Sequence, residues 1–203
     1  MYNFDVDWRE KGIVTPVIDQ GQCGASWAIP PVGALESQHA KATGKLVALS
    51  VRNAIDCAGK DISCNGGSFG VVYKYIIDNH GIDTDAGYPS QLPECVCHFD
   101  PTKIGATMID YKELKAEDEN DLQQAVANIG PVAAAIDASH PSFQFYTTGG
   151  RNFSLIFFFY YKMSRFSLVY NEPSCSQIQL NHAILIVGYG TLSGTPYWIA
   201  KNR

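Results

Sequence analysis

Hydrophobic positions in the first 130 residues recur every three or four residues, which is the spacing of helices with one buried face. In the first such segment Val32, Leu35 and Ala42 share a face, and Gly44 provides a stop signal. Ser50 is a suitable N-cap for the second segment. The pattern predicts helices over residues 26–45, 50–58, 69–79 and 119–129.

Two consecutive prolines, Pro30 and Pro31, lie near the first turn of the first predicted helix. Proline is tolerated at the first helical position but costs about 3 kcal/mol in a helix interior. We therefore expect the start of this helix to be irregular. The start matters because the free N–H groups and the dipole of a first turn favour negative charge close by.

The periodicity changes after Pro131, where short apolar runs are rich in β-branched and aromatic residues. A helical first half followed by a β-rich second half predicts an α+β fold in two lobes. The length of 203 residues fits a single domain, 1–203, with lobes of about 10–110 and 111–203. Strands are expected over residues 132–136, 183–189 and 197–201.

Residues 150–169 fit neither pattern and are interpreted as an anomalous insert. They read GRNFSLIFFFYYKMSRFSLV, and their seven-residue apolar run is far shorter than the roughly 20 residues of a membrane-spanning helix. The bias toward Phe, Tyr, Lys and Ser is typical of translated AT-rich noncoding DNA, so we hypothesise a retained intron or a gene-model error. The alternative is a loop that touches a membrane or gates a substrate. In the translated protein this segment is expected to be an exposed apolar patch.

The composition narrows the possible partners. The net charge of −5 provides no basic face for nucleic acid and no polybasic patch for a membrane surface. Six cysteines in a short chain favour a disulfide framework in an oxidising compartment, and six cysteines allow fifteen pairings. A zinc site at residues 95–98, Cys-Val-Cys-His, lacks a second ligand pair at finger spacing.

Several separated stretches resemble the mature domain of cathepsin L-type, papain-like cysteine peptidases. They occur in family order over most of the chain, and the resemblance implies a papain-like fold. Its helical N-terminal lobe would face a β-sheet or half-barrel lobe. CGAS, YWIAKN and KYIIDNHGIDTD are most similar to the silicateins, sponge members with serine at the nucleophile position that are implicated in silica condensation. The stretches are VDWREKGIVTPVIDQGQCGASWA (6–28), GALES (33–37), CNGG (64–67), ANIGPVAAAID (127–137), LNHAILIVGYG (180–190) and YWIAKN (197–202).

The resemblance implies the site residues. Ser26 stands where the family has its nucleophilic cysteine, His182 is the general base and acid, and Asn202 orients the imidazole. Gln20 and the backbone N–H of Ser26 would stabilise the oxyanion. Gly66 and Gly67 would pair with an extended peptide, and Phe69 and Ala135 would line the pocket for its second residue before the cleaved bond. The remaining histidines, interpreted as surface or packing residues, are His39, His80, His98 and His140.

The resemblance also implies two disulfides, Cys23–Cys64 and Cys57–Cys97, whereas Cys95 has no obvious partner. Cys175 resembles a family cysteine whose mate lies beyond the end of this chain. Family members are extracellular or lysosomal, need no cofactor at this site, and are made with a signal and a propeptide that are not seen here. The family continues past Asn202 with more strands, so we expect a C-terminally truncated domain of marginal stability.

The serine at position 26 changes the expected chemistry. A hydroxyl cannot form the thiolate–imidazolium pair that activates papain-like cysteines, so it must lose its proton during attack. We expect a hydrolase that is weak on peptides or proteins but acts on easier electrophiles, such as esters or silicic acid species. The alternatives are an inactive peptide-binding or matrix homologue and a defective gene-model fragment.

Overall fold

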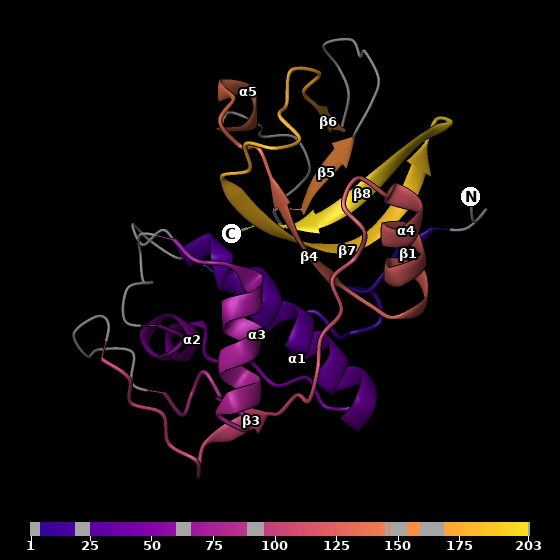
Figure 1. Ribbon diagram of the computed structural model, residues 1–203. Coiled ribbons are helices and arrows are strands. Elements are labelled where there is room, and N and C mark those ends of the chain that lie inside the picture. The colour runs from indigo at the N-terminus through magenta and orange to yellow at the C-terminus, as the bar shows by residue number, and fades with distance from the viewer. Residues whose placement is uncertain are drawn as a thin grey trace.

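The computed structural model describes residues 5–18, 25–59, 66–88, 96–144, 146, 154–158 and 169–202. Helices gather in one half of the molecule and a twisted sheet forms the other half (Figure 1). The helical half contains η1 (Ala25–Trp27), α1 (Ile29–Thr43), α2 (Val51–Cys57), α3 (Phe69–Asp78) and the pair β2 (Ile82–Asp83) and β3 (Ile104–Ala106). The sheet half contains β1 (Val6–Asp7), β4 (Val132–Ile136), β5 (Ser154–Phe158), β6 (Tyr170–Asn171), β7 (His182–Leu192) and β8 (Thr195–Lys201), with α4 (Glu119–Asn128) and α5 (Pro141–Gln144).

The four predicted helices are confirmed, but the first begins later than predicted. Ser26 lies in the short 3-10 helix η1, and α1 starts only at Ile29. Ala28 at the N-cap has no side chain to accept a hydrogen bond, and Pro30 and Pro31 sit in the first turn, where their missing N–H groups break no helical bond. The predicted irregularity at the start of this helix is therefore confirmed.

Helices α2 and α4 begin at side-chain caps, and α1 ends at the predicted glycine. The Ser50 hydroxyl accepts a 3.0 Å hydrogen bond from the Asn53 N–H and starts α2. Asp118 accepts from two backbone N–H groups of the first turn of α4 in the same way. At the end of α1, Gly44 adopts φ +73° and its N–H bonds the Ala40 carbonyl at 2.8 Å, a conformation that glycine adopts without strain.

Strand β7 is the centre of the sheet. The strand order is β1-β7-β8-β5-β6, and β4 also pairs with β7. Along one edge of β7, β4 pairs with the end near His182 and β1 pairs with Gly188 and Tyr189. A Cβ at Gly188 would lie only 2.0 Å from the Val6 carbonyl oxygen, so glycine permits this close approach of β1. The three predicted strands are confirmed, and β7 and β8 extend beyond their predicted limits.

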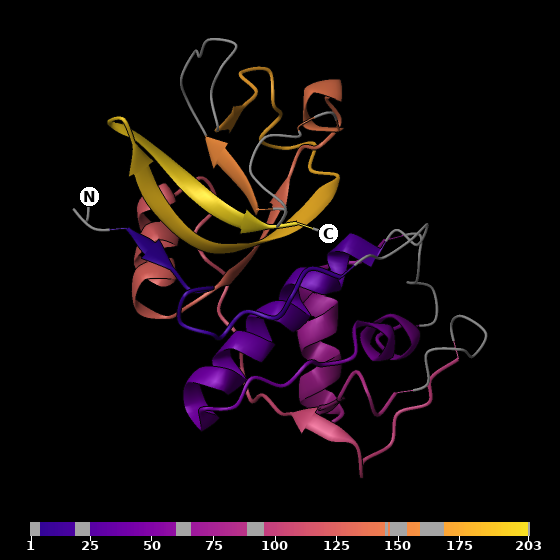
Figure 2. The same ribbon diagram turned by 180° about the vertical axis from the view of Figure 1, so that it is seen from behind.

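Helix α1 joins the two halves. It contacts α2 and α3 on the helical side and β4 and β7 on the sheet side. At Gly33 a Cβ would meet a Leu185 methyl at 3.0 Å, which shows how closely the helix approaches β7. Strand β8 ends on the side of the sheet that faces α1 (Figure 2). We propose that the division between the halves falls near residue 111, between the end of β3 and the start of α4.

Ser154–Phe158, within the segment 150–169, form strand β5 of the sheet. The backbone of β5 pairs antiparallel with β8, where Leu155 lies opposite Ala200, and its end pairs parallel with β6. No strand was predicted in this segment, which was interpreted as an anomalous insert. Whether an apolar run forms a strand depends on the neighbouring strand with which it pairs, and the local sequence does not specify that neighbour. Residues 159–168 lie outside the described part of the chain.

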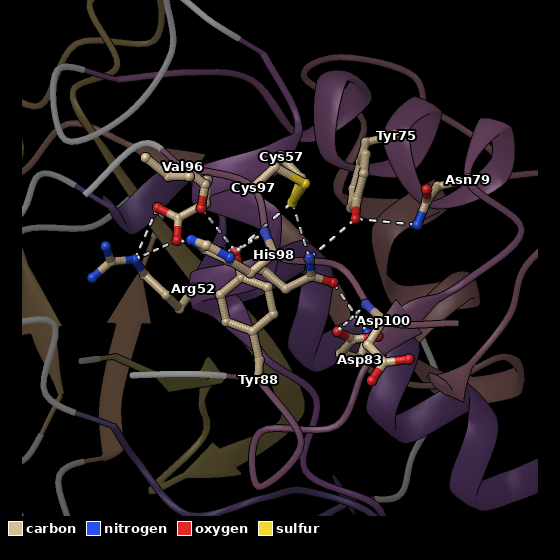
Figure 3. Close-up of a disulfide and its surroundings, with 12 residues drawn as sticks. Arg52, Cys57, Tyr75, Asn79, Asp83, Tyr88, Val96, Cys97, His98 and Asp100 are labelled. Atoms are coloured by element: carbon tan, nitrogen blue, oxygen red, sulfur yellow. Dashed lines mark hydrogen bonds and ion pairs between the residues drawn. A yellow bond between two sulfur atoms is a disulfide. The ribbon is translucent and has the colours of Figure 1, made fainter. Parts of the chain in front are cut away.

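The Cys57–Cys97 disulfide is confirmed, with an S–S distance of 2.04 Å, and it ties the end of α2 to the segment before β3 (Figure 3). Beside it, the Tyr88 hydroxyl donates to Asp56 and accepts from the His98 N–H, both at 3.1 Å. Because Cys97 is disulfide-bonded, its sulfur is not available to bind zinc. Cys175 is the one free cysteine in the described ranges. The predicted Cys23–Cys64 pair lies outside them.

Candidate active site

His182 and Asn202 form the centre of the candidate site. His182 begins β7, and Asn202 follows the end of the neighbouring strand β8. The register pairs Leu185 with Lys201, so the residue after Lys201 lies beside the start of β7. The His182 Nε2 and Asn202 Oδ1 atoms are 2.7 Å apart and partly buried. An amide oxygen can only accept, so Nε2 carries the proton and Nδ1 is the basic nitrogen of the neutral ring.

Neighbouring backbone contacts fix the position of His182. It lies opposite Ile136 in the β4–β7 ladder. The preceding residue, Asn181, donates its backbone N–H to the Ile136 carbonyl at 3.0 Å, and its side-chain Oδ1 accepts from the Ala138 N–H at 2.8 Å. The residue before the histidine is therefore fastened to the end of β4 on both sides.

An aromatic side chain that the sequence did not indicate covers the imidazole. The Phe143 ring, on α5, meets the His182 ring edge to face, with 5.9 Å between centroids. The Phe143 ring also packs edge to face against the ring of Tyr170, with 5.6 Å between centroids. The only sequence signal was the aromatic density of residues 143–146, which does not specify a partner. Phe143 therefore limits rotation of the imidazole and shields one side of it from water.

Asp137 secures the loop that leads into His182. Its carboxylate accepts hydrogen bonds from the Ser139 hydroxyl at 2.6 Å and from the Ser176 N–H at 2.9 Å. These bonds, together with the Ser139 N–H, lower the pKa of Asp137 to about 2. The His140 Nε2 atom lies 3.6 Å from Oδ2 of the same carboxylate. His140, interpreted from the sequence as a surface or packing residue, therefore contacts Asp137. Sequence inspection missed Asp137 because its partners lie up to 39 residues away.

Ser26 lies in η1, and this short helix contacts β7, the strand that begins with His182. The serine is half-buried and is followed by Trp27, which is only 4% exposed. The turn is therefore anchored in the core of the helical half. Because two of the first three residues of α1 are proline, the amino end of this helix offers fewer N–H donors to a negative charge near Ser26 than an ordinary helix does.

The predicted peptide-binding residues lie on both halves of the molecule. Gly66 adopts φ +121°, a conformation that strains other residues, and Gly67 is exposed. Phe69 is the half-buried first residue of α3. Ala135 is exposed on β4 and pairs with Ala183, the residue after the histidine. The predicted oxyanion donor Gln20 lies outside the described residues.

The described residues were also compared with the requirements of a metal site and of a membrane-spanning helix. No cluster of three or more His, Cys, Asp or Glu side chains in these ranges is arranged to bind a metal ion. None of the helices in the same part of the chain has the length and apolar character of a membrane span.

Comparison with known proteins identifies the family of the chain. The family model described as papain family cysteine protease matches residues 2–203. A cathepsin L-like peptidase of Aedes aegypti is 47% identical over 97% of this chain and 53% of its own length. Cathepsin S of Mus musculus is 45% identical over 97% of this chain and 53% of its own length. The chain thus spans about half the length of the curated relatives it matches.

Solved structures give the same result for the fold. The digestive procathepsin L2 proteinase of the Tenebrio molitor larval midgut superposes with a TM-score of 0.84 at 37% identity, over 100% of this chain and 58% of that one. Procathepsin L 3 of the same tissue gives a TM-score of 0.81 at 40% identity, over 98% and 59%. The predicted α+β, papain-like fold is confirmed, and the chain belongs to the papain family of cysteine proteases.

Proposed function

We propose that this protein is a hydrolase in which Ser26 is the nucleophile and His182 is its base. The observation that carries the proposal is the 2.7 Å hydrogen bond between His182 Nε2 and Asn202 Oδ1. With Nε2 as donor, Nδ1 is the nitrogen that can take a proton from a hydroxyl. The contact between η1 and β7 supports the assignment of Ser26 to this nitrogen.

In the proposed reaction the Ser26 oxygen attacks an acyl carbon while its proton passes to His182. The tetrahedral oxyanion would be held by the Gln20 amide and the Ser26 N–H. His182 then returns the proton to the leaving group, and water releases the acyl group by the reverse steps. Asn202 keeps the ring in the required tautomer throughout.

The neutral partner of His182 limits the rate on amides. An imidazolium forms as the serine loses its proton, and Asn202 stabilises that charge less than an aspartate would. We therefore propose extended peptides or proteins as slow substrates and esters or silicon alkoxides as faster ones. The silicatein-like motifs are the reason for including silicic acid species.

Replacing one atom tests the proposal. Ser26→Cys restores the thiolate chemistry of the family, so its peptide kcat/KM is expected to rise at least about 100-fold over that of the wild type. Ser26→Ala should abolish ester hydrolysis, whereas Ser193→Ala, in the exposed turn at the far end of β7, should leave it unchanged. The proposal would be rejected if wild type and Ser26→Ala hydrolysed the ester equally well and Ser26→Cys gained no peptidase activity.

A second candidate function is a peptide-binding or matrix protein without catalysis. Gly66 and Gly67 favour it, because a backbone without side chains can pair with an extended peptide. Peptide binding by calorimetry together with an unreactive Ser26 would select this function. For either function, the disulfide and the similarity to cathepsins lead us to propose an extracellular or lysosomal location.

A further inference from the structure

Three polar side chains connect the helix that follows Ser26 to the strand that precedes Asn202. Glu36, on α1, is only 6% exposed, and its Oε2 accepts a 2.6 Å hydrogen bond from the Thr15 hydroxyl. That hydroxyl accepts a 2.9 Å hydrogen bond from the Lys201 Nζ. The Thr15 hydroxyl therefore donates its proton to Glu36 and accepts a hydrogen bond from Lys201, and these two bonds fix the orientation of the hydroxyl.

The position of these residues links them to the candidate site. Lys201 is the last residue of β8, and Asn202 comes next in the chain. Glu36 lies two turns into α1, the helix that begins three residues after Ser26. Its second oxygen, Oε1, accepts from the Leu49 N–H at 2.9 Å, so the carboxylate cannot move without losing two bonds.

These contacts are poorly explained as a contribution to stability. Burial raises the pKa of Glu36 and lowers the pKa of Lys201, so in each case it disfavours the charged form. The charged groups that act on Glu36 from other elements are Lys201, which favours its ionisation, and Asp85, which opposes it. Buried charged groups of this kind can often be replaced by apolar ones at no loss of stability. We infer that Glu36 and Lys201 instead fix the positions of α1 and β8 relative to each other.

We propose that Thr15, Glu36 and Lys201 are positioning residues that set where Asn202, and through it His182, lies relative to the Ser26 turn. The inference rests on the proposed function, because it assigns these residues to the same site. The chain Glu36–Thr15–Lys201 crosses from the helical half to the sheet half of the molecule. It links the end of β8 to α1 through Thr15, and the direction of the Asn202 amide follows from the position of that strand end.

Thr15→Val removes the bridging oxygen and keeps the shape of the side chain. Thr15→Ser restores the oxygen, and Thr43→Val makes the same exchange at an exposed site on α1 where the hydroxyl bonds only the local backbone. Two quantities are measured: kcat and KM for ester hydrolysis, and the NMR resonance of the His182 Nε2–H proton.

For Thr15→Val we expect kcat to fall roughly 10- to 100-fold with KM changed less than about twofold, because displaced catalytic groups lose rate and not ground-state binding. The His182 Nε2–H resonance should shift or disappear through exchange with water. Thr15→Ser and Thr43→Val should match the wild type in both. If Thr15→Val does not fold, Glu36→Gln serves instead, since it keeps the size of the side chain but replaces one of its two accepting oxygens with an NH2 donor, and it should shift the same resonance.

A lower melting temperature for Thr15→Val, with kcat and the His182 resonance unchanged, would overturn the proposal and leave a purely structural role. If the wild type hydrolyses no ester, the proposed function fails. The NMR comparison then still decides whether these three residues control the His182–Asn202 geometry.

Discussion

Removing the Cys57–Cys97 disulfide should lower the free energy of unfolding by a predictable amount. The bond closes a loop with a sequence separation of 40 residues. Loop-closure entropy for that length gives about 4 kcal/mol at 25 °C, a large share of the roughly 5–15 kcal/mol that stabilises a typical domain. The native fold should survive the loss, because the Tyr88 hydroxyl still holds the His98 N–H. The Asp100 N–H still bonds Asp83 at 3.0 Å.

The double variant Cys57→Ser/Cys97→Ser is compared with the wild type by urea unfolding followed by tryptophan fluorescence. We expect the midpoint to fall and the m-value to rise slightly, because the unfolded chain without a cross-link exposes more surface. Cys175→Ser, which alters the free and half-buried thiol, is the control and should unfold close to the wild type. A loss below about 1 kcal/mol with an unchanged m-value would refute the loop-entropy reasoning.

Three further outcomes are expected. Asn202→Ala should lower ester kcat roughly tenfold or more, because it leaves His182 without its tautomer-fixing acceptor, and steady-state kinetics would contradict this if kcat stayed the same. The pKa of Asp137 is lowered to about 2 in the folded state, so its stabilising contribution is present above pH 4 and is lost as pH falls toward 2. Asp137→Asn should therefore show a weaker loss of stability between pH 5 and pH 2.5 in urea titrations, and equal losses would count against it. Ser50→Ala removes the N-cap of α2 and should cost about 1 kcal/mol in the same assay, with no change refuting the cap.

The spacing of apolar residues was enough to predict the helices, and short apolar runs predicted the main strands, of which β7 is buried over eight consecutive residues. The spacing placed the ends of α3 and α4 within one residue. The start of α1 was harder, since the two prolines signal irregularity without saying where the helix resumes. Strand β5 could not be predicted at all, because a strand at that point depends on pairing with β8.

Some residues of the candidate site were likewise predicted from the sequence, and others were not. His182 and Asn202 were predicted from motifs, and the structure brings their side chains together at 2.7 Å. Phe143 and Asp137 were not predicted, since their roles depend on contacts between elements that are distant in sequence. Lys201 is an extreme case, because its hydrogen-bond partner is 186 residues away in the chain. Contacts of that kind become visible only when the two halves of the molecule are placed together.

Covalent labelling of Ser26 is the most direct test of the central claim, that a hydroxyl at this position is activated by His182. The purified protein is treated with a fluorophosphonate near neutral pH, and the modified residue is located by peptide mapping and mass spectrometry. The account predicts a phosphonylated Ser26 in the wild type and at least roughly 100-fold slower labelling in His182→Ala. Labelling at the same rate in both proteins, or none at Ser26 in the folded wild type, would contradict it.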